Sequence, residues 1–250
     1  MDTLSGLVAE MHRLINAANE RQIQLRAFGG LAILEHSHED SRFFRRDAPD
    51  IDLMIPKNER HKLESFFRSM GYSPDKQFNL LNGMRRQIYH RDSDGLRIDI
   101  LVGDFEMCHK LPLEDRLHVD RLTIPLAELL LSKAQIVELN HKDAFDIISL
   151  LLNNEVGRED EGKIGLHRIA WLCAQEWGLH KTTSINLQRV EETLLAEDMG
   201  LDAEKRELIV SRIRQIQSAM EAEEKPLAWR LRDRVGTRVR WYSEVEEVDQ

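Results

Sequence analysis

The sequence predicts an α+β protein with a small mixed sheet flanked by helices, followed by an all-helical C-terminal region. Polar and apolar residues alternate at 50–55 and 96–102, which is typical of half-buried strands. From Pro125 onward, apolar residues recur with helical spacing instead. This change of pattern predicts two domains, at residues 1–123 and 124–250.

The expected elements follow from the same patterns and from the residues that interrupt them. Gly29-Gly30 ends a short strand, Pro56 ends another, and Asn58 and Gly71 are expected to cap and to stop the next helix. An acidic, glycine-containing stretch at 153–165 predicts a linker. The first half is expected to hold helix 4–20, strand 24–28, helix 31–36, strand 50–55, a helix after residue 58, and strands 86–90 and 96–102; the second half, helices within 126–152, 166–177, 186–195 and 203–220.

Composition narrows the class of protein. The net charge is −9, which argues against broad binding to a nucleic-acid backbone, although Arg230 and its basic neighbours up to Arg240 form a local run. No apolar stretch approaches the roughly 18 residues of a membrane helix, and no secretory signal is evident. Cys108 and Cys173 are too few for a disulfide framework. We therefore expect a cytoplasmic protein with no membrane partner.

Asp50 and Asp52 are the first candidate functional residues. On a strand, side chains two residues apart point to the same face, so both carboxylates would stand together while Ile51 turns to the core. Two adjacent anions call for a cation between them, and oxygen ligands suit Mg²⁺. An Asp-x-Asp pair in isolation also occurs in purely structural roles.

Asp99 lies on a second alternating strand. If that strand neighbours residues 50–55, Asp99 joins the pair, and three carboxylates can hold two metal ions that activate an attacking oxygen and stabilise a leaving phosphate. In the alternative interpretation, Asp99 only pairs with Arg97 or Arg86 at the surface.

Gly29 and Gly30 stand between a strand and a helix, where backbone N–H groups can receive phosphate. A simple turn is the alternative for such a pair.

Together these residues resemble the signature of minimal nucleotidyltransferases of the polymerase-β-like superfamily. Phe28-Gly29-Gly30 is followed by Arg46 and by Asp50-Ile51-Asp52, and Asp99 matches the later acidic residue. The chain is most similar to AbiEii-type proteins and aminoglycoside nucleotidyltransferases, although Ala48 stands where those often carry a hydroxyl. The resemblance implies a nucleotidyltransferase fold at 1–123, Mg²⁺ or Mn²⁺ as cofactor, and an NTP such as ATP as substrate.

The helical half adds Lys133 and the run Lys142-Asp143-x-x-Asp146, which resembles later AbiEii-type motifs. Arg46, Lys133 and Lys142 are therefore expected to offset charge on the triphosphate. Salt bridges on an exposed helix face are the alternative.

These expectations describe an enzyme that transfers an NMP group to an acceptor hydroxyl by a two-metal mechanism. The acceptor remains open between a small molecule, a protein side chain and a tRNA end. Two other classes also remain open: a toxin-like regulator held silent by an antitoxin-like partner, and a non-catalytic nucleotide-binding protein of the same fold.

Overall fold

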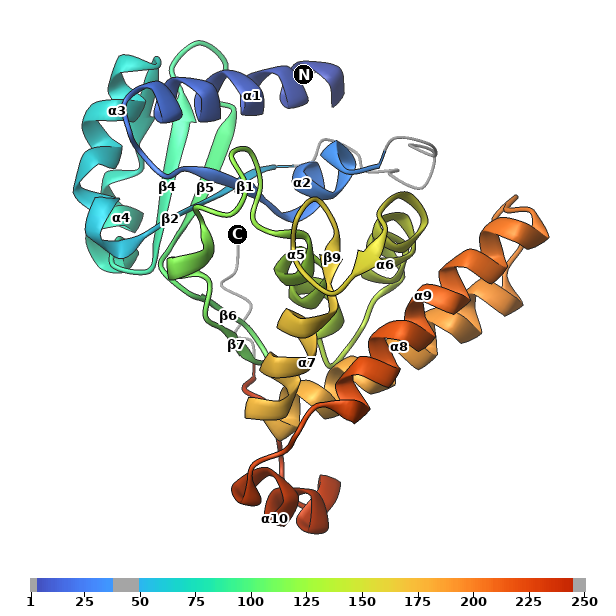
Figure 1. The fold of residues 1–250 in the computed structure, drawn as a ribbon. Coiled ribbons are helices and arrows are strands. Elements are labelled where there is room, and N and C mark those ends of the chain that lie inside the picture. The colour runs from blue at the N-terminus through green and yellow to red at the C-terminus, as the bar shows by residue number, and fades with distance from the viewer. Residues whose placement is uncertain (1–3, 38–49, 245–250) are drawn as a thin grey trace. The chain divides into compact units, whose positions relative to one another are not determined.

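The computed structural model describes residues 4–37 and 50–244 (Figure 1). The described residues divide into two compact units. The first lies within Met1–Glu35, Arg45–Phe105 and Pro112–Pro125, and the second takes in Glu106–Leu111 and the chain from Leu126. No helix in the described part of the chain is long and apolar enough to cross a membrane.

The first unit is built on a five-stranded mixed sheet in the order β1-β2-β5-β4-β3. β2 and β5 run parallel, and the other neighbouring pairs are antiparallel. This confirms the α+β class, and it meets the condition that the two alternating strands are neighbours. The strands are β1 (Arg26–Phe28), β2 (Ile51–Ile55), β3 (Tyr72–Pro74), β4 (Arg86–Arg91) and β5 (Arg97–Val102), and the helices are α1 (Leu4–Glu20), α2 (Gly29–Glu35), α3 (Leu63–Ser69) and α4 (Lys76–Asn82), with 3₁₀ turns η2 (Lys57–Lys62) and η3 (Glu114–Arg116).

The period of two along the central strands separates an apolar face of the sheet from a charged one. Ile51 and Leu53 of β2 and Ile98 and Ile100 of β5 are fully buried on one face. Tyr89 of β4 shares that face by its register with Ile98, and it stacks on Phe67 of α3 with ring centroids 4.5 Å apart. Asp52 and Asp99 therefore fall on the opposite face.

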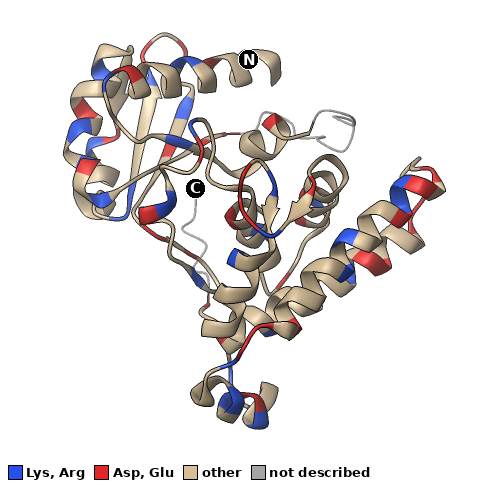
Figure 2. Ribbon diagram, viewed as in Figure 1, with Lys and Arg blue, Asp and Glu red and all other residues tan. Residues whose placement is uncertain are grey.

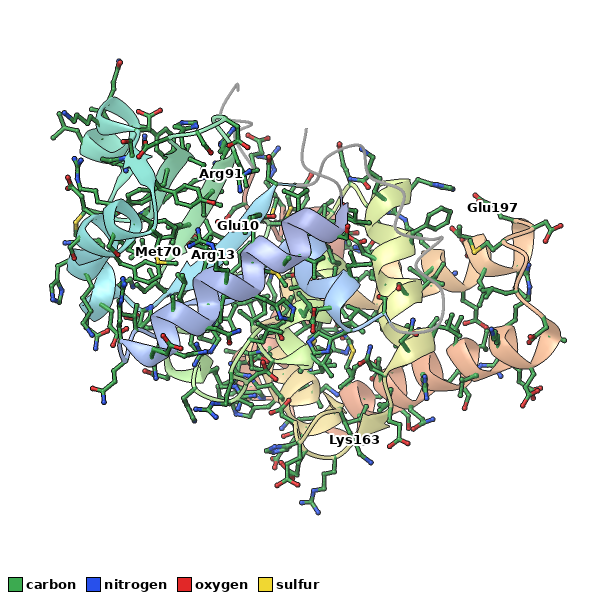
Figure 3. The ribbon with its side chains drawn as sticks, turned by 90° about the horizontal axis from the view of Figure 1, so that it is seen from above. Glu10, Arg13, Met70, Arg91, Lys163 and Glu197 are labelled. Atoms are coloured by element: carbon green, nitrogen blue, oxygen red, sulfur yellow. The ribbon has the colours of Figure 1, made fainter. Side chains whose placement is uncertain are left out.

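Helix α1 is tied to the first unit by polar contacts as well as by its apolar side. Arg13 pairs with Glu10 at 2.6 Å and donates to the carbonyl oxygen of Met70, so these three side chains gather beside one another (Figure 3). The hydroxyl of the buried Tyr72 donates to the same Glu10 at 2.6 Å. Arg13 thereby lowers the pKa of Glu10 against the opposing effect of burial, and Tyr72 lowers it further.

A later segment of the chain covers the outer edge of β1. The backbone N–H of Ala27 donates to the carbonyl of Leu122, and the N–H of Ile124 donates to the carbonyl of Ala27. The Arg26 side chain donates to the Asp120 carbonyl. An edge strand presents unpaired backbone groups, and here the returning chain satisfies those of β1.

The second unit is mainly helical, and it carries basic and acidic residues along its helices (Figure 2). Within the segment expected as a linker, Val156–Gly157 and Ile164–Gly165 form a short parallel ladder. A further pair of two-residue strands, β6 (Phe105–Glu106) and β7 (Lys110–Leu111), forms a separate sheet. The helices are α5 (Leu126–Ala134), α6 (His141–Asn153), α7 (Leu166–Gln175), α8 (Trp177–Ala196), α9 (Ala203–Ala222) and α10 (Leu227–Val235), with strands β8 (Val156–Gly157) and β9 (Ile164–Gly165) and a 3₁₀ turn η4 (Gly236–Arg238).

Candidate functional site

The parallel pairing of β2 and β5 brings two of the candidate carboxylates together. Asp52 and Asp99 are direct register partners. Neighbouring strands lie about 4.8 Å apart, and partner positions project to the same face, so the two acidic side chains stand side by side. Asp99 is only 6% exposed, whereas Asp52 is half-buried.

Asp50 immediately precedes β2 and is exposed to solvent. Its charge nevertheless acts on the same neighbour as the other two carboxylates, the guanidinium of Arg86. The hydrogen bond to Asp99 raises the pKa of Arg86 against the opposing effect of burial, and the charges of Asp99, Asp52 and Asp50 add to the increase. All three predicted carboxylates therefore contribute to one negative field around Arg86.

Gly29 is packed directly against Asp52. Its backbone has a φ of 68°, in the left-handed region that favours glycine. A Cβ at this position would lie 2.4 Å from Oδ2 of Asp52, which is closer than such atoms approach. Gly29 thus leaves room for the Asp52 carboxylate at the junction of β1 and α2. Gly30, the second residue of α2, is buried.

Asp99 is held by two arginines. Arg86 donates from Nε to Oδ1 at 2.8 Å and from Nη2 to Oδ2 at 2.5 Å, the paired geometry of a bidentate contact. Arg97 donates from Nη2 to Oδ2 at 3.1 Å. The alternative interpretation of Asp99 as a partner of Arg97 or Arg86 is therefore realised, with both arginines at once and with the carboxylate buried rather than on the surface.

The carboxylate oxygens suit a hard divalent cation in their chemistry. Across residues 4–37 and 50–244, however, no three Asp, Glu, His or Cys side chains are grouped in the way that a bound metal ion requires. At Asp99 both carboxylate oxygens face arginines, Arg86 and Arg97. Carboxylate oxygens suit Mg²⁺ or Mn²⁺ by their chemistry, but a metal ion bound at Asp99 would have to displace these arginine contacts.

Lys133 and Lys142 belong to the second unit and differ in exposure. The Lys133 ammonium lies 2.9 Å from Asp143 and 2.9 Å from Asp146, and all three side chains are largely buried. Burial alone would lower the pKa of Lys133, but the charges of Asp146 and Asp143 outweigh it, so the pKa is raised. Lys142 is exposed. The pairing expected on an exposed helix face is thus a buried cluster.

Two arginines named in the sequence analysis, Arg46 and Arg86, need separate comment. Arg46 lies outside the described residues. Arg86 was considered only as a surface partner of Asp99, although the β4–β5 hairpin carries a usable signal: Arg86, Ile88 and His90 alternate opposite Leu101, Asp99 and Arg97. Periodicity alone does not fix the pairing register of the two strands. Only the actual register of the hairpin places Arg86 next to Asp99.

The chain matches one family model and is similar to solved structures at low sequence identity. No curated protein matches the chain at a significant level. Among solved structures, an antigenic nucleotidyltransferase-like protein from Paracoccidioides brasiliensis is 16% identical over 89% of this chain and 95% of its own, with a TM-score of 0.46. The antibiotic-resistance factor ANT(2'')-Ia is 16% identical over 88% of this chain and 97% of its own, with a TM-score of 0.38.

A family model described as an uncharacterised nucleotidyltransferase matches residues 4–144. That match spans more than half of the 250 residues and includes β1, β2 and β5 with Gly29, Asp52 and Asp99. The chain belongs to this nucleotidyltransferase family.

Proposed function

We propose that the protein transfers an NMP group from an NTP to an acceptor hydroxyl, with pyrophosphate as the leaving group. The observation that carries the proposal is the register of Asp52 with Asp99, combined with the contact of Gly29 on Asp52. Membership of the nucleotidyltransferase family supports the same chemistry.

In this proposal Asp50, Asp52 and Asp99 hold Mg²⁺ or Mn²⁺ in a two-metal arrangement. The bound metal supplies electrophilic activation of the phosphate and stabilises the leaving oxygen. Asp99 also accepts the proton of the acceptor hydroxyl, through Oδ1, because Oδ2 already accepts from two arginines. The chain's own contribution is then mainly positioning and electrostatics, as phosphoryl transfer requires.

Gly29 and Gly30 are assigned to the phosphate groups of the nucleotide. Gly29 adjoins Asp52, so phosphates bound through a cation at Asp52 would lie beside this turn. A side chain at Gly29 would occupy that space. Arg46, Lys133 and Lys142 are assigned to the charge of the triphosphate. For Lys133 this assignment requires the ammonium to interact with phosphate from within its cluster with Asp143 and Asp146.

We also propose that the protein is related to AbiEii-type proteins. ATP is the proposed NTP, and an antitoxin-like protein is a proposed partner. A small molecule, a protein side chain and a tRNA end all present the hydroxyl that the chemistry needs. The net charge of −9 favours a short or small acceptor over a long nucleic acid.

The test is pyrophosphate release from each of the four NTPs with Mg²⁺ or Mn²⁺, using cell extract as the source of acceptor. Asp52→Asn is the inactive variant, because it keeps the shape of the side chain and removes its charge. Asp94→Asn is the matched control: Asp94 lies in the β4–β5 turn and pairs with Arg91.

We expect release by the wild type and by Asp94→Asn, and none by Asp52→Asn at equal folded content. Equal release by both variants would refute the assignment of Asp52. NTP binding without any release would instead identify a non-catalytic nucleotide-binding protein. Release that appears only after a co-purified partner is removed would identify the toxin-like regulator.

A further inference from the structure

The hydrogen bonds to Asp99 occupy most of the acceptor positions of its carboxylate. A carboxylate has about four lone-pair positions, two on each oxygen. Oδ2 accepts from Arg86 and from Arg97, while Oδ1 accepts from Arg86. Oδ2 is therefore filled, and Oδ1 has one position in addition to its contact with Arg86.

Arg86 lies between Asp99 and the aromatic ring of Phe78, and it is partly exposed. Its guanidinium lies over the ring of Phe78 of α4, 5.8 Å from the centroid. Its side chain is 37% exposed, whereas that of Asp99 is 8% exposed. The carboxylate is thus buried in the sheet, and the arginine that contacts it is partly exposed to solvent.

The Asp52–Asp99 pair needs a cation even in the absence of a metal. Two carboxylates on adjacent strands repel each other, and positive charge close to them offsets this repulsion. Arg86 supplies that charge to Asp99, and the field of Asp52 and Asp50 also reaches it.

We propose that Arg86 is a built-in counter-cation of the Asp52–Asp99 pair that competes with the divalent metal for Asp99. This inference rests on the proposed function. Arg86 holds the Asp99 carboxylate in place beside Asp52 and offsets the negative charge of the pair. A divalent metal bound at Asp99 would have to displace the Arg86 fork, and the guanidinium would remain beside Phe78 next to the reacting groups.

Mn²⁺ binding to the full chain tests the inference directly, by calorimetric titration and by the paramagnetic resonance signal of free Mn²⁺, without nucleotide. The variants are R86Q, which removes the charge, and R86K, which keeps the charge without the planar fork. R91Q is the matched control, because Arg91 lies on the same strand and makes a similar bidentate contact with Asp94. D52N reports whether the bound Mn²⁺ occupies this site.

We expect R86Q to bind Mn²⁺ about tenfold more tightly than the wild type, because the metal no longer displaces a charge-assisted contact that solvent partly screens. R86K is expected to lie between them, R91Q to match the wild type, and D52N to lose the site. In metal-free buffer R86Q is expected to unfold at a lower temperature, with added Mn²⁺ raising it more than in the wild type.

Equal or weaker Mn²⁺ binding by R86Q and R86K overturns the inference and leaves Arg86 as a group that only orients Asp99. That result, with D52N still abolishing binding, leaves the proposed function standing. Absence of any Mn²⁺ binding that depends on Asp52 overturns the inference and the metal site of the proposed function together.

Discussion

Substitution of Gly29 by alanine is expected to damage both the fold and the site, and the two costs can be separated. The first cost is the backbone: at a φ of 68°, an L-residue loses about 1–2 kcal/mol. The second cost is the contact of the new Cβ with Asp52, 2.4 Å from Oδ2 and 3.2 Å from Cγ. Relief of this contact requires the Asp52 side chain to rotate away, at about 0.5–1.5 kcal/mol. The total is about 1.5–3.5 kcal/mol.

Gly71→Ala is the matched control. Gly71 belongs to the same unit and has a φ of 85°, but a Cβ there would have no atom within 4 Å. Only the backbone cost of about 1–2 kcal/mol applies. Urea denaturation gives the free energy of unfolding of each variant, and pyrophosphate release gives its activity. We expect Gly71→Ala to retain transfer and Gly29→Ala to lose it, because Asp52 is displaced.

A double-mutant cycle with Asp52→Ala isolates the contact, because that substitution removes Oδ2 and Cγ. The cost of Gly29→Ala in the Asp52→Ala background should fall by about 0.5–1.5 kcal/mol, to the backbone cost alone. Additive free energies across the cycle, together with unaltered transfer by Gly29→Ala, would refute the view that Gly29 makes room for the Asp52 carboxylate.

Two further outcomes follow from buried groups of the second unit. Lys133→Met should lower the free energy of unfolding by about 3–5 kcal/mol, because Asp143 and Asp146 lose their buried cation. Lys142→Met, at an exposed position, should change the free energy of unfolding by less than about 0.5 kcal/mol in the same urea titration. Equal effects of the two substitutions would contradict the buried cluster. Burial raises the pKa of the Cys173 thiol to about 12 from an ordinary value of 9.0. As the pH rises, the thiol therefore loses its proton in the unfolded chain before it does so in the native protein. The free energy of unfolding consequently falls as the pH rises from 9 towards 12. The slope from this group is about 1.4 kcal/mol per pH unit, and Cys173→Ala should remove it from the measured pH dependence; an unchanged slope would show that the thiol titrates normally in the native protein.

The elements with strong periodicity were predictable from the sequence. The strands at 50–55 and 96–102 have one apolar face each, and they form β2 and β5 with only small changes at their ends. Their pairing was stated only as a condition, because periodicity identifies a face of a strand and not its neighbour. The parallel register of Asp52 with Asp99 depends on the whole order of the sheet.

Local capping signals were less informative. Asn58 was expected to cap a helix, but the chain instead enters the 3₁₀ turn Lys57–Lys62 after Pro56 without a side-chain cap. A side-chain cap forms at Asp75 instead, whose carboxylate accepts from the N–H of Phe78 at the start of α4. Strand β3 and helix α4 were missed because each is short, at Tyr72–Pro74 and Lys76–Asn82, and too brief to show a period.

The sequence indicates the candidate carboxylates more clearly than the contacts that they make. Residue type and spacing point to Asp50, Asp52 and Asp99, which stay predicted site residues. The contacts of Asp99 and Lys133 depend on the tertiary structure, because periodicity does not show that Arg86 and Arg97 both bind Asp99 or that Lys133 is buried with Asp143.

The edge of β1 is covered by residues that are synthesised much later than the strand itself. Ala27 is completed by hydrogen bonds to Leu122 and Ile124, which the ribosome adds almost a hundred residues later. At about 5–20 residues per second, synthesis leaves that edge uncovered for roughly 5–20 s. During this interval the nascent chain carries an unpaired strand edge two residues before Gly29, and chaperones have that time in which to protect it.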